Sequence, residues 1–305
     1  DRHGYFSLSL SVGYEKDLIS VAKTVILEIN PNLPRTYGDT HVHISEVDYI
    51  VEHEAPLVEV QPIEPSEEEK AIGQYVAELI EDGSTIQLGI GGIPNAIAKF
   101  LMNKKDLGVH TEMFTDGMVD LAEAGVVTGR KKTIWRGKMV GNFALGTKKL
   151  YNFVNENLAV EFQPGRVTND PRVIAKNYKM VSVNTALQID LTGQVVSESI
   201  GHIQYSGTGG QNDTAIGAQM SPGGKSIIAL RSTAKNGTIS TIVPVLPPGA
   251  KVTLLRADVD YVVTEYGVAH LKARSIRERV RQLISIAHPD FREELRREAE
   301  RLKLW

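Results

Sequence analysis

The sequence contains no cysteine among its 305 residues. Disulfide bonds, thiolate catalysis and zinc sites with cysteine ligands are therefore excluded. An excess of charge of one sign is also missing, because 34 Lys and Arg stand against 37 Asp and Glu, a net charge of −3. A surface that follows nucleic-acid phosphates normally needs a basic excess, so we expect no nucleic-acid partner.

Long apolar runs, internal repeats and low-complexity tracts are absent as well. No run approaches the length of a membrane span and no signal peptide opens the chain, so we expect a soluble, cytoplasmic protein. At 42% hydrophobic residues, the chain is long enough for one large or two ordinary domains. The sequence opens on Asp1 rather than Met and resembles the middle of a protein, which leads us to expect a missing upstream segment.

Apolar residues at strand and helix spacing alternate along the chain, which indicates an α/β fold. Strands are expected at residues 5–12, 41–51, 85–88, 109–114, 180–183, 226–230 and 252–255. Apolar residues at helical spacing predict a helix from Leu18 to Ile26 and another beginning at Pro94. Two more are predicted near the end, one after Ser275 and a terminal helix capped by Asp290. A further helix begins at the capping box of Ser66 and Glu69 and stops at Gly83. Residues 56–69, with three prolines, are the best candidate linker.

Two glycine clusters are candidates for contact with a ligand. The first, Gly89, Ile90, Gly91 and Gly92, joins a short apolar strand to a helix, and the second includes Gly207, Gly209 and Gly210. Glycines let the backbone approach a ligand closely, and a strand–loop–helix unit presents free N–H groups to an anion. The alternative is that both clusters are tight turns. The first lacks the spacing of a dinucleotide fingerprint or a P-loop, which argues against a dehydrogenase.

His41 and His43 share one face of an expected strand, a spacing that suits metal chelation. No third ligand lies near them in the sequence, which favours two half-exposed strand histidines. We therefore expect no metal site.

Glu112 lies in the stretch HTEMFTDG at residues 110–117, where the expected strand would point it off one face. A desolvated carboxylate can attack a thioester carbonyl and give an anhydride that a thiolate reopens. Such a group needs a neighbour that orients it without neutralising it, and the amide of Asn169 is of that kind. From spacing alone, however, a lone glutamate is more often not a nucleophile.

Six motifs in this order resemble the acetyl-CoA hydrolase/transferase family, particularly its 4-hydroxybutyrate and butyrate CoA-transferase branch. They are GIGGIPNA (89–96), HTEMFTDGMVDL (110–121), VTNDP (167–171), DLTGQVVSESIG (190–201), YSGTGGQND (205–213) and TEYGVAHL (264–271). The resemblance implies a two-domain CoA-transferase (NagB/RpiA-like) architecture. Residues 1–64 would be the remainder of a first domain truncated at its N-terminus, and residues 65–305 the second domain with the catalytic glutamate.

The resemblance also implies roles for individual residues. Glu112 matches the family's catalytic glutamate, and Asn169 matches an asparagine beside it. The loop from Gly89 through Ile93 to Pro94 matches a segment that holds CoA and lends a backbone N–H, that of Ile90, to the oxyanion. Gly209 and Gly210 match the other side of the site, and which of them donates stays open. Glu198 is a rival nucleophile, and Glu265 is either a supporting group or an acid at a helix start.

The function implied is transfer of CoA from an acyl-CoA (4-hydroxybutyryl-, butyryl- or acetyl-CoA) to a carboxylate such as acetate, by a ping-pong route through a glutamyl-CoA thioester. An acyl-CoA thioester would be the substrate, with no permanently bound cofactor. The resemblance also implies a homodimer, the usual oligomeric state of the family. Two alternatives remain: an acyl-CoA hydrolase, in which water replaces the acceptor acid, and a non-catalytic acyl-CoA-binding subunit.

Overall fold

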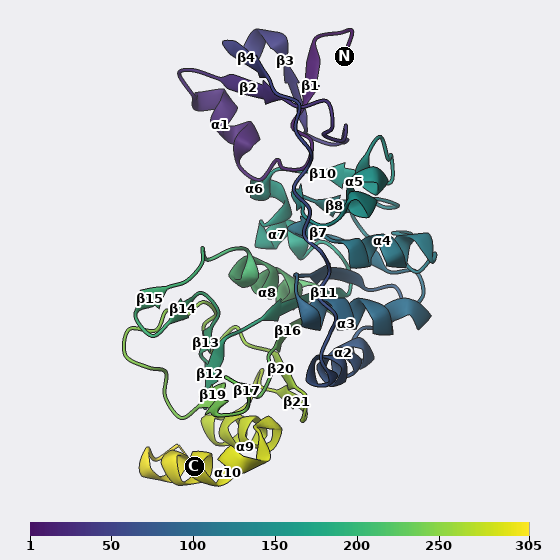
Figure 1. The fold of residues 1–305 in the computed structure, drawn as a ribbon. Helices are drawn as coiled ribbons and strands as arrows, with labels where there is room; N and C mark the ends of the chain where they lie inside the picture. Colours follow the sequence, from purple (N-terminus) through teal and green to yellow (C-terminus); the bar gives the residue numbers. More distant parts are fainter. Residues whose placement is uncertain (305) are drawn as a thin grey trace.

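The computed structural model describes residues 1–304, so that Trp305, the last residue of the second expected domain, lies outside it. The first part of the chain is a small α/β unit, at the top of Figure 1. Its strands β1 and β3 pair antiparallel, while β2 and β4 pair parallel. Its elements are β1 (Tyr5–Ser7), α1 (Glu15–Val21), β2 (Ile26–Ile29), β3 (His41–His43), the 3₁₀ helix η1 (Ile44–Glu46) and β4 (Tyr49–Glu52).

Three predictions in this unit are wrong in part. The strand pair expected within residues 41–51 is present as β3 and β4, but these strands pair with β1 and β2 and not with each other. The strand expected to reach Val12 ends at Ser7, because Ser9 takes a left-handed φ of 61° that an extended strand does not allow. The helix expected to reach Ile26 ends at Val21, and Ile26 instead begins β2. Thr24, Val25 and Ile26 are all β-branched, which favours the extended backbone.

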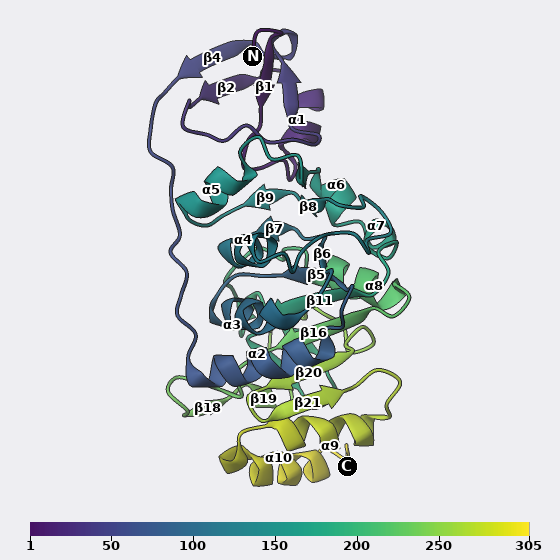
Figure 2. The same ribbon diagram turned by 90° about the vertical axis from the view of Figure 1, so that its right-hand side faces the viewer.

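The segment predicted as a linker contains no helix or strand over most of its length. Residues 53–66 contain no helix or strand and run along the side of the molecule, as Figure 2 shows, to the start of α2 (Glu67–Leu79). The capping box is present: Ser66 Oγ accepts from the Glu69 N–H at 3.3 Å, and the Glu69 carboxylate accepts from the Ser66 N–H at 2.9 Å. Residues 67–69 therefore belong to the helix and not to the linker.

A six-stranded sheet forms the centre of the molecule, in the order β21-β20-β16-β11-β5-β6. All neighbours are parallel except β21, which is antiparallel to β20. The strands are β5 (Thr85–Leu88), β6 (Gly108–Val109), β11 (Met180–Thr185), β16 (Lys225–Ala229), β20 (Tyr261–Thr264) and β21 (Gly267–His270). The predicted α/β class is confirmed. The strand expected at residues 252–255 is reduced to one bridge between Leu254 and Val195.

The direction in which the chain winds reverses between β5 and β11. From β5 the chain passes through α3 (Gly92–Phe100) to β6 on one side, whereas from β11 it returns through α8 (Gln211–Met220) to β16 on the other. Figures 1 and 2 show α3 and α8 on opposite faces of the sheet. In open α/β sheets, ligands bind beyond the carboxyl ends of the strands at such a point. Both glycine clusters lie there. The first runs into α3, whose first residue is Gly92, and the second ends immediately before α8.

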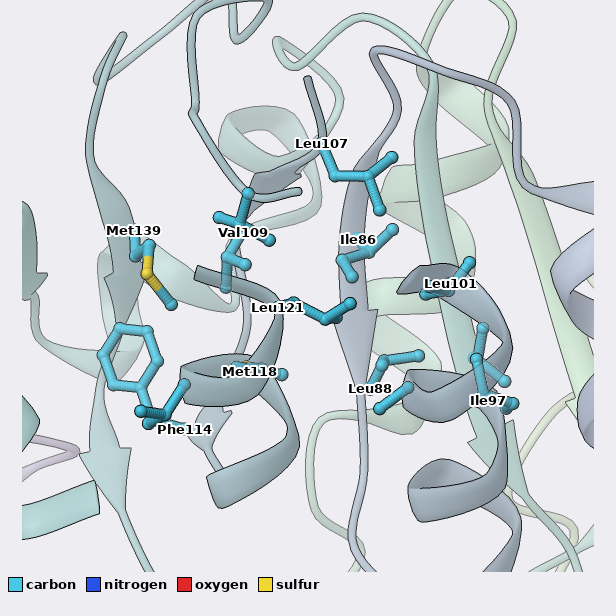
Figure 3. Close-up of a cluster of buried hydrophobic side chains, with 14 of the residues drawn as sticks. Ile86, Leu88, Ile97, Leu101, Leu107, Val109, Phe114, Met118, Leu121 and Met139 are labelled. Carbon is cyan, nitrogen blue, oxygen red and sulfur yellow. The ribbon is translucent and has the colours of Figure 1, made fainter. Parts of the chain in front are cut away.

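A buried apolar cluster holds this region in place (Figure 3). Side chains from β5, β6, α3, α4 (Asp116–Glu123) and the 3₁₀ helix after α3 pack together with little or no exposed area. They include Ile86, Leu88, Ile97, Leu101, Val109, Met118 and Leu121. Burying each stabilises the fold by about 1.5–3 kcal/mol, so the loops that leave β5 and β6 start from rigid positions.

The strand predicted at residues 109–114 is two short strands. Gly108–Val109 pairs with β5, and Met113–Phe114, as β7, pairs with β9 (Phe143–Ala144). Between them His110 bridges Val140 of β8 (Met139–Gly141), and the Glu112 carbonyl accepts from the N–H groups of Asn142 and Phe143. The chain changes partner at this point, which interrupts the strand and leaves Glu112 in the gap.

Further helices and small sheets surround this frame. They are η2 (Leu101–Asn103), α5 (Lys148–Val154), β10 (Val160–Phe162), α6 (Gly165–Thr168), α7 (Pro171–Ile174), β12 (Gln188–Asp190), β13 (Val195–Val196), β14 (Ser199–Ile200), β15 (Ile203–Gln204), β17 (Thr233–Ala234), β18 (Ile239–Ser240), β19 (Ile242–Val243), α9 (Ile276–Ile286) and α10 (Pro289–Arg301).

The helix starts predicted from the sequence are partly right. The capping box of Ser275 and Glu278 begins α9 as expected. Asp290 is not the cap of α10, because His288 takes that position and its ring accepts from the Asp290 N–H at 3.3 Å. The helix expected from Pro94 begins two residues earlier, at Gly92.

Candidate functional site

Glu112 is half-buried, with its carboxylate between Asn169 and Gly210. Asn169 donates from Nδ2 to Glu112 Oε2 at 2.5 Å. A Cβ added to Gly210 would lie 2.1 Å from the same Oε2 and 2.6 Å from Asn169 Nδ2. The structure therefore brings together three residues that are widely separated in the sequence.

The Asn169 amide suits a carboxylate that must react. An N–H donor to an ionised oxygen gives a short, charge-assisted hydrogen bond, but it transfers no proton to the carboxylate. Asn169 follows α6 and its own N–H donates to the Gly165 carbonyl at 2.9 Å, which fixes its backbone. The carboxylate is thus held in place by a donor that cannot protonate it.

The second glycine cluster has different environments along its length. Gly210 is buried and immediately precedes α8, whereas Gly207 and Gly209 are exposed, with no atom within 4 Å of an added Cβ. Gly209 has a left-handed φ of 63° that favours glycine. Gly210 is therefore the glycine of this cluster that contacts the Glu112 carboxylate.

The first cluster leaves β5 at the same edge of the sheet from which Glu112 leaves β6. Gly91 has a φ of 109°, and a Cβ on Gly92 would lie 2.1 Å from Glu69 Oε2. The turn therefore requires glycine at residue 91, and the contact with Glu69 requires it at residue 92. Ile90 is 50% exposed, while Ile93 and Pro94 are buried in α3. Only residues 89–91 of this loop remain open to a ligand.

A cavity of about 190 Å³ lies beside this first loop. It is bounded by the linker, by α3 and by the start of α4. Its lining includes Val60, Ile63, Ile90, Gly91, Met102 and Gly117. Glu112 and Gly210 do not line it, so this space adjoins the carboxylate's segment without enclosing the carboxylate.

Two buried titratable side chains, His110 and Lys132, make contacts with or beside the segment that carries Glu112. His110 has its Nε2 3.0 Å from the Thr168 carbonyl, and burial, followed by the charge of Lys132, lowers the pKa of His110 to about 4. Lys132 donates from Nζ to the carbonyls of Val109 and Lys138, and burial lowers its own pKa to about 7. A neutral His110 must carry its proton on Nε2, because the carbonyl can only accept.

Asp213, in the first turn of α8, adds a carboxyl group near the site. Burial is the main cause that raises the pKa of Asp213, and the charges of Glu112 and Asp170 add to it. The sequence analysis missed Asp213, His110 and Lys132. The first two lie inside the motifs quoted for the family, which was a usable signal, whereas nothing in the sequence distinguished Lys132.

The two other candidate glutamates differ from Glu112 in their surroundings. Glu198, between β13 and β14, is buried, and its Oε2 has no hydrogen-bond partner within residues 1–304. Glu265 accepts from the N–H and Oγ of Ser232 at 2.9 and 2.6 Å. The interpretation of Glu265 as a helix-start acid is wrong, because residues 265–266 form the turn of the β20–β21 hairpin.

Among residues 1–304 no group of three acidic or histidine side chains is arranged to hold a metal ion. His41 and His43 instead lie beside the ring of Tyr5. None of the helices in the same residues is both long and apolar enough to cross a membrane.

Comparison with known proteins gives two family matches. Residues 1–62 match the acetyl-CoA hydrolase/transferase N-terminal domain, and residues 146–299 match the C-terminal domain. Succinyl-CoA:cyclohexane-1-carboxylate CoA transferase of Geobacter metallireducens is 55% identical over 99% of this chain and 69% of its own length. The 4-hydroxybutyrate coenzyme A transferase of Clostridium kluyveri is 55% identical over 98% and 70%. The crystal structure of RipA from Yersinia pestis superposes with a TM-score of 0.96 at 43% identity, covering 100% of this chain and 69% of RipA.

Proposed function

The chain is a CoA-transferase of the acetyl-CoA hydrolase/transferase family, and we propose that it moves CoA between an acyl-CoA and a free carboxylate through a glutamyl-CoA thioester on Glu112. One observation carries the proposal. The Glu112 carboxylate is half-buried, hydrogen-bonded by Asn169 and pressed against Gly210 at the switch point of the sheet.

The proposed reaction begins when Glu112 attacks the thioester carbonyl of the acyl-CoA. The CoA thiolate leaves, and an anhydride joins the acyl group to the glutamate. The thiolate then attacks the glutamyl carbonyl of that anhydride, so that the first acid leaves as a carboxylate and CoA is bound to Glu112 as a thioester. A second carboxylate attacks this thioester, and the same two steps in reverse yield the new acyl-CoA and free Glu112.

Two backbone donors would stabilise the tetrahedral oxyanions. We assign one to the N–H of Ile90, which is at the open end of the first loop, and the other to Gly209 or Gly210. Because Gly210 contacts Glu112, we favour Gly210 over Gly209 as the second donor. Losing one such donor raises the barrier by about 3 kcal/mol. Asn169 would orient the attacking oxygen.

The substrates belong to the same proposal. Proteins similar to this chain are named for succinyl-CoA with cyclohexane-1-carboxylate, for 4-hydroxybutyrate, and for butyryl-CoA with acetate. We propose 4-hydroxybutyryl-, butyryl- or acetyl-CoA as donor and a short carboxylate such as acetate as acceptor. We also propose that the protein is a cytoplasmic homodimer and that its two domains divide after residue 64.

Trapping of the intermediate tests this function. The protein is mixed with butyryl-CoA alone, treated with borohydride or hydroxylamine, digested and examined by mass spectrometry. Modification of the peptide containing Glu112 is expected, and a modified Glu198 in its place would overturn the assignment. In a parallel assay, CoA transfer to added acetate is compared with CoA release in its absence. Release that does not depend on acetate would identify a hydrolase.

A further inference from the structure

We propose that Asn142 is a positioning residue for this reaction, and that it holds the amide of Asn169 in the one orientation that donates to Glu112. The proposal deepens the proposed function of Glu112 and rests on it. Asn142 lies in the gap between β8 and β9, opposite the interrupted strand that carries Glu112, and it is 3% exposed.

Asn142 contacts both members of the Glu112–Asn169 pair. Its backbone N–H donates to the Glu112 carbonyl at 3.0 Å. Its side-chain Nδ2 donates to Thr168 Oγ1 at 3.0 Å and approaches Asn169 Oδ1 at 3.5 Å. A single buried residue thus fixes the backbone of the expected nucleophile and the side chain of its hydrogen-bond partner.

The donors around Asn169 determine which way its amide points. Its Oδ1 faces Asn142 Nδ2 and the hydroxyl of Thr168, which lies 3.3 Å away, while its Nδ2 faces Glu112. Turned by 180°, the amide would set its NH₂ against the NH₂ of Asn142 and its carbonyl oxygen against the Glu112 carboxylate. Both contacts would be repulsive, so the donor on Asn142 selects the orientation that serves Glu112.

The orientation of the Asn142 amide itself destabilises the folded protein. Its Oδ1 is buried without a hydrogen-bond partner among the described residues. Turned by 180°, Asn142 could accept from the Thr168 hydroxyl through Oδ1, but it would then present an oxygen to Asn169 Oδ1. An unpaired buried carbonyl destabilises a protein, and in native structures such a group requires an explanation. Orientation of Asn169 is that explanation.

His110 makes a further contact between the Glu112 segment and the end of α6. Its ring donates to the Thr168 carbonyl at 3.0 Å, which ties the end of α6 to the segment of Glu112. His110 therefore sets the separation between the two segments, and Asn142 sets the rotation of the amide that spans them.

A double-mutant cycle tests the role of Asn142. In Asn142→Ala we expect kcat to fall about tenfold while KM for acyl-CoA stays within twofold, because the substrate does not contact this side chain. In an Asn169→Ala background the same substitution should change kcat by less than twofold, since its effect passes through Asn169. Independent effects that multiply in the double variant, or a single variant with normal kcat, would overturn the proposal.

Controls separate positioning from general loss of stability. Asn177 is also buried, with both side-chain polar atoms unpaired, but it precedes β11 at the opposite edge of the sheet. Asn177→Ala should leave kcat unchanged, and its melting temperature shows what the loss of a buried, unpaired amide does to stability alone. Should Asn142→Ala not fold, Asn142→Ser, which keeps a donor, replaces it and should retain more activity than Asn142→Asp, which has none. A normal kcat in Asn142→Asp would equally overturn the proposal.

Trapping distinguishes failure of this inference from failure of the proposed function. If wild-type protein is not modified at Glu112 by acyl-CoA and borohydride, the function itself is wrong. If Glu112 is modified in the wild type but the cycle shows independent effects, only the role of Asn142 is wrong.

Discussion

Gly210 leaves no room for a side chain beside Glu112, since a Cβ at residue 210 would lie 2.1 Å from Glu112 Oε2. This contact ties the turn before α8 to the interrupted strand after β6. The carboxylate, its amide partner and the turn consequently form one unit, and changes at any of the three should act on the same step of the reaction.

Gly210→Ala should reduce kcat by about 100-fold or more, because displacement of a reacting group by about 1 Å has an effect of that size. The added methyl group would displace the Glu112 carboxylate and Asn169 Nδ2. Gly207→Ala, in the same turn, meets no atom within 4 Å and has no left-handed φ, so its kcat should change only a few-fold. Steady-state assays with butyryl-CoA and acetate make the comparison, and equal losses would show that contact with Glu112 is not the cause.

Glu112→Gln should lower turnover by at least about 1000-fold, the scale on which removal of a nucleophile acts. The amide keeps the shape of the side chain but is a far weaker nucleophile. Glu198→Gln is the matched variant, because it replaces another carboxylate that is shielded from solvent, in this case a buried one. This variant should keep turnover within a few-fold. The reverse pattern would make Glu198 the nucleophile.

Asp213→Asn should stabilise the folded protein at pH 7. The folded-state pKa of Asp213 is raised, so above the unfolded value near 3.9 the folded state binds more protons and its stability falls as the pH rises. The substitution removes that penalty, and its advantage should vanish near pH 3. Melting temperatures measured across this range check the prediction.

Asp170→Asn should show the opposite dependence. Hydrogen bonds from Arg172 lower the pKa of Asp170, so the stability it contributes is present at neutral pH and is lost as the pH falls through its folded value. The asparagine variant should therefore be the less stable one at pH 7 and equal to the wild type in acid. Matching pH profiles for both variants would contradict the assignment of opposite shifts.

Lys132→Met should change the dependence of stability on alkaline pH. The folded pKa of Lys132, about 7, lies below the unfolded value near 10.4. Between these values the unfolded chain binds more protons, so the wild type gains stability relative to the variant, on the order of a few kcal/mol by pH 10. Urea unfolding at pH 6, 8 and 9.5 measures the gain, and Lys23→Met controls for removal of an exposed lysine. A constant difference between wild type and Lys132→Met would show that Lys132 is not desolvated.

Local signals predicted the elements wherever a few neighbouring residues determine them. The capping boxes at Ser66 and Ser275 begin α2 and α9 because each satisfies helix N–H groups within one turn. Local signals failed where another part of the chain decided the outcome. Leu18 to Ile26 has helical spacing, yet Ile26 pairs with Tyr49 of β4, and Glu265 lies in a hairpin turn that β21 imposes by pairing with β20.

The sequence by itself determined the family, through motifs such as HTEMFTDG and YSGTGGQND, and it singled out Glu112, Asn169 and Gly210 one by one. Only the tertiary structure decided that these three meet. Asn169 lies 57 residues from Glu112. It follows β10, whose parallel partner β8 is bridged to the Glu112 segment through Val140 and His110. The positions of Asn142, His110 and Lys132 behind the carboxylate were also decided there. Burial and hydrogen-bond pairing are set by which segments pack together, and no local pattern of residues specifies that.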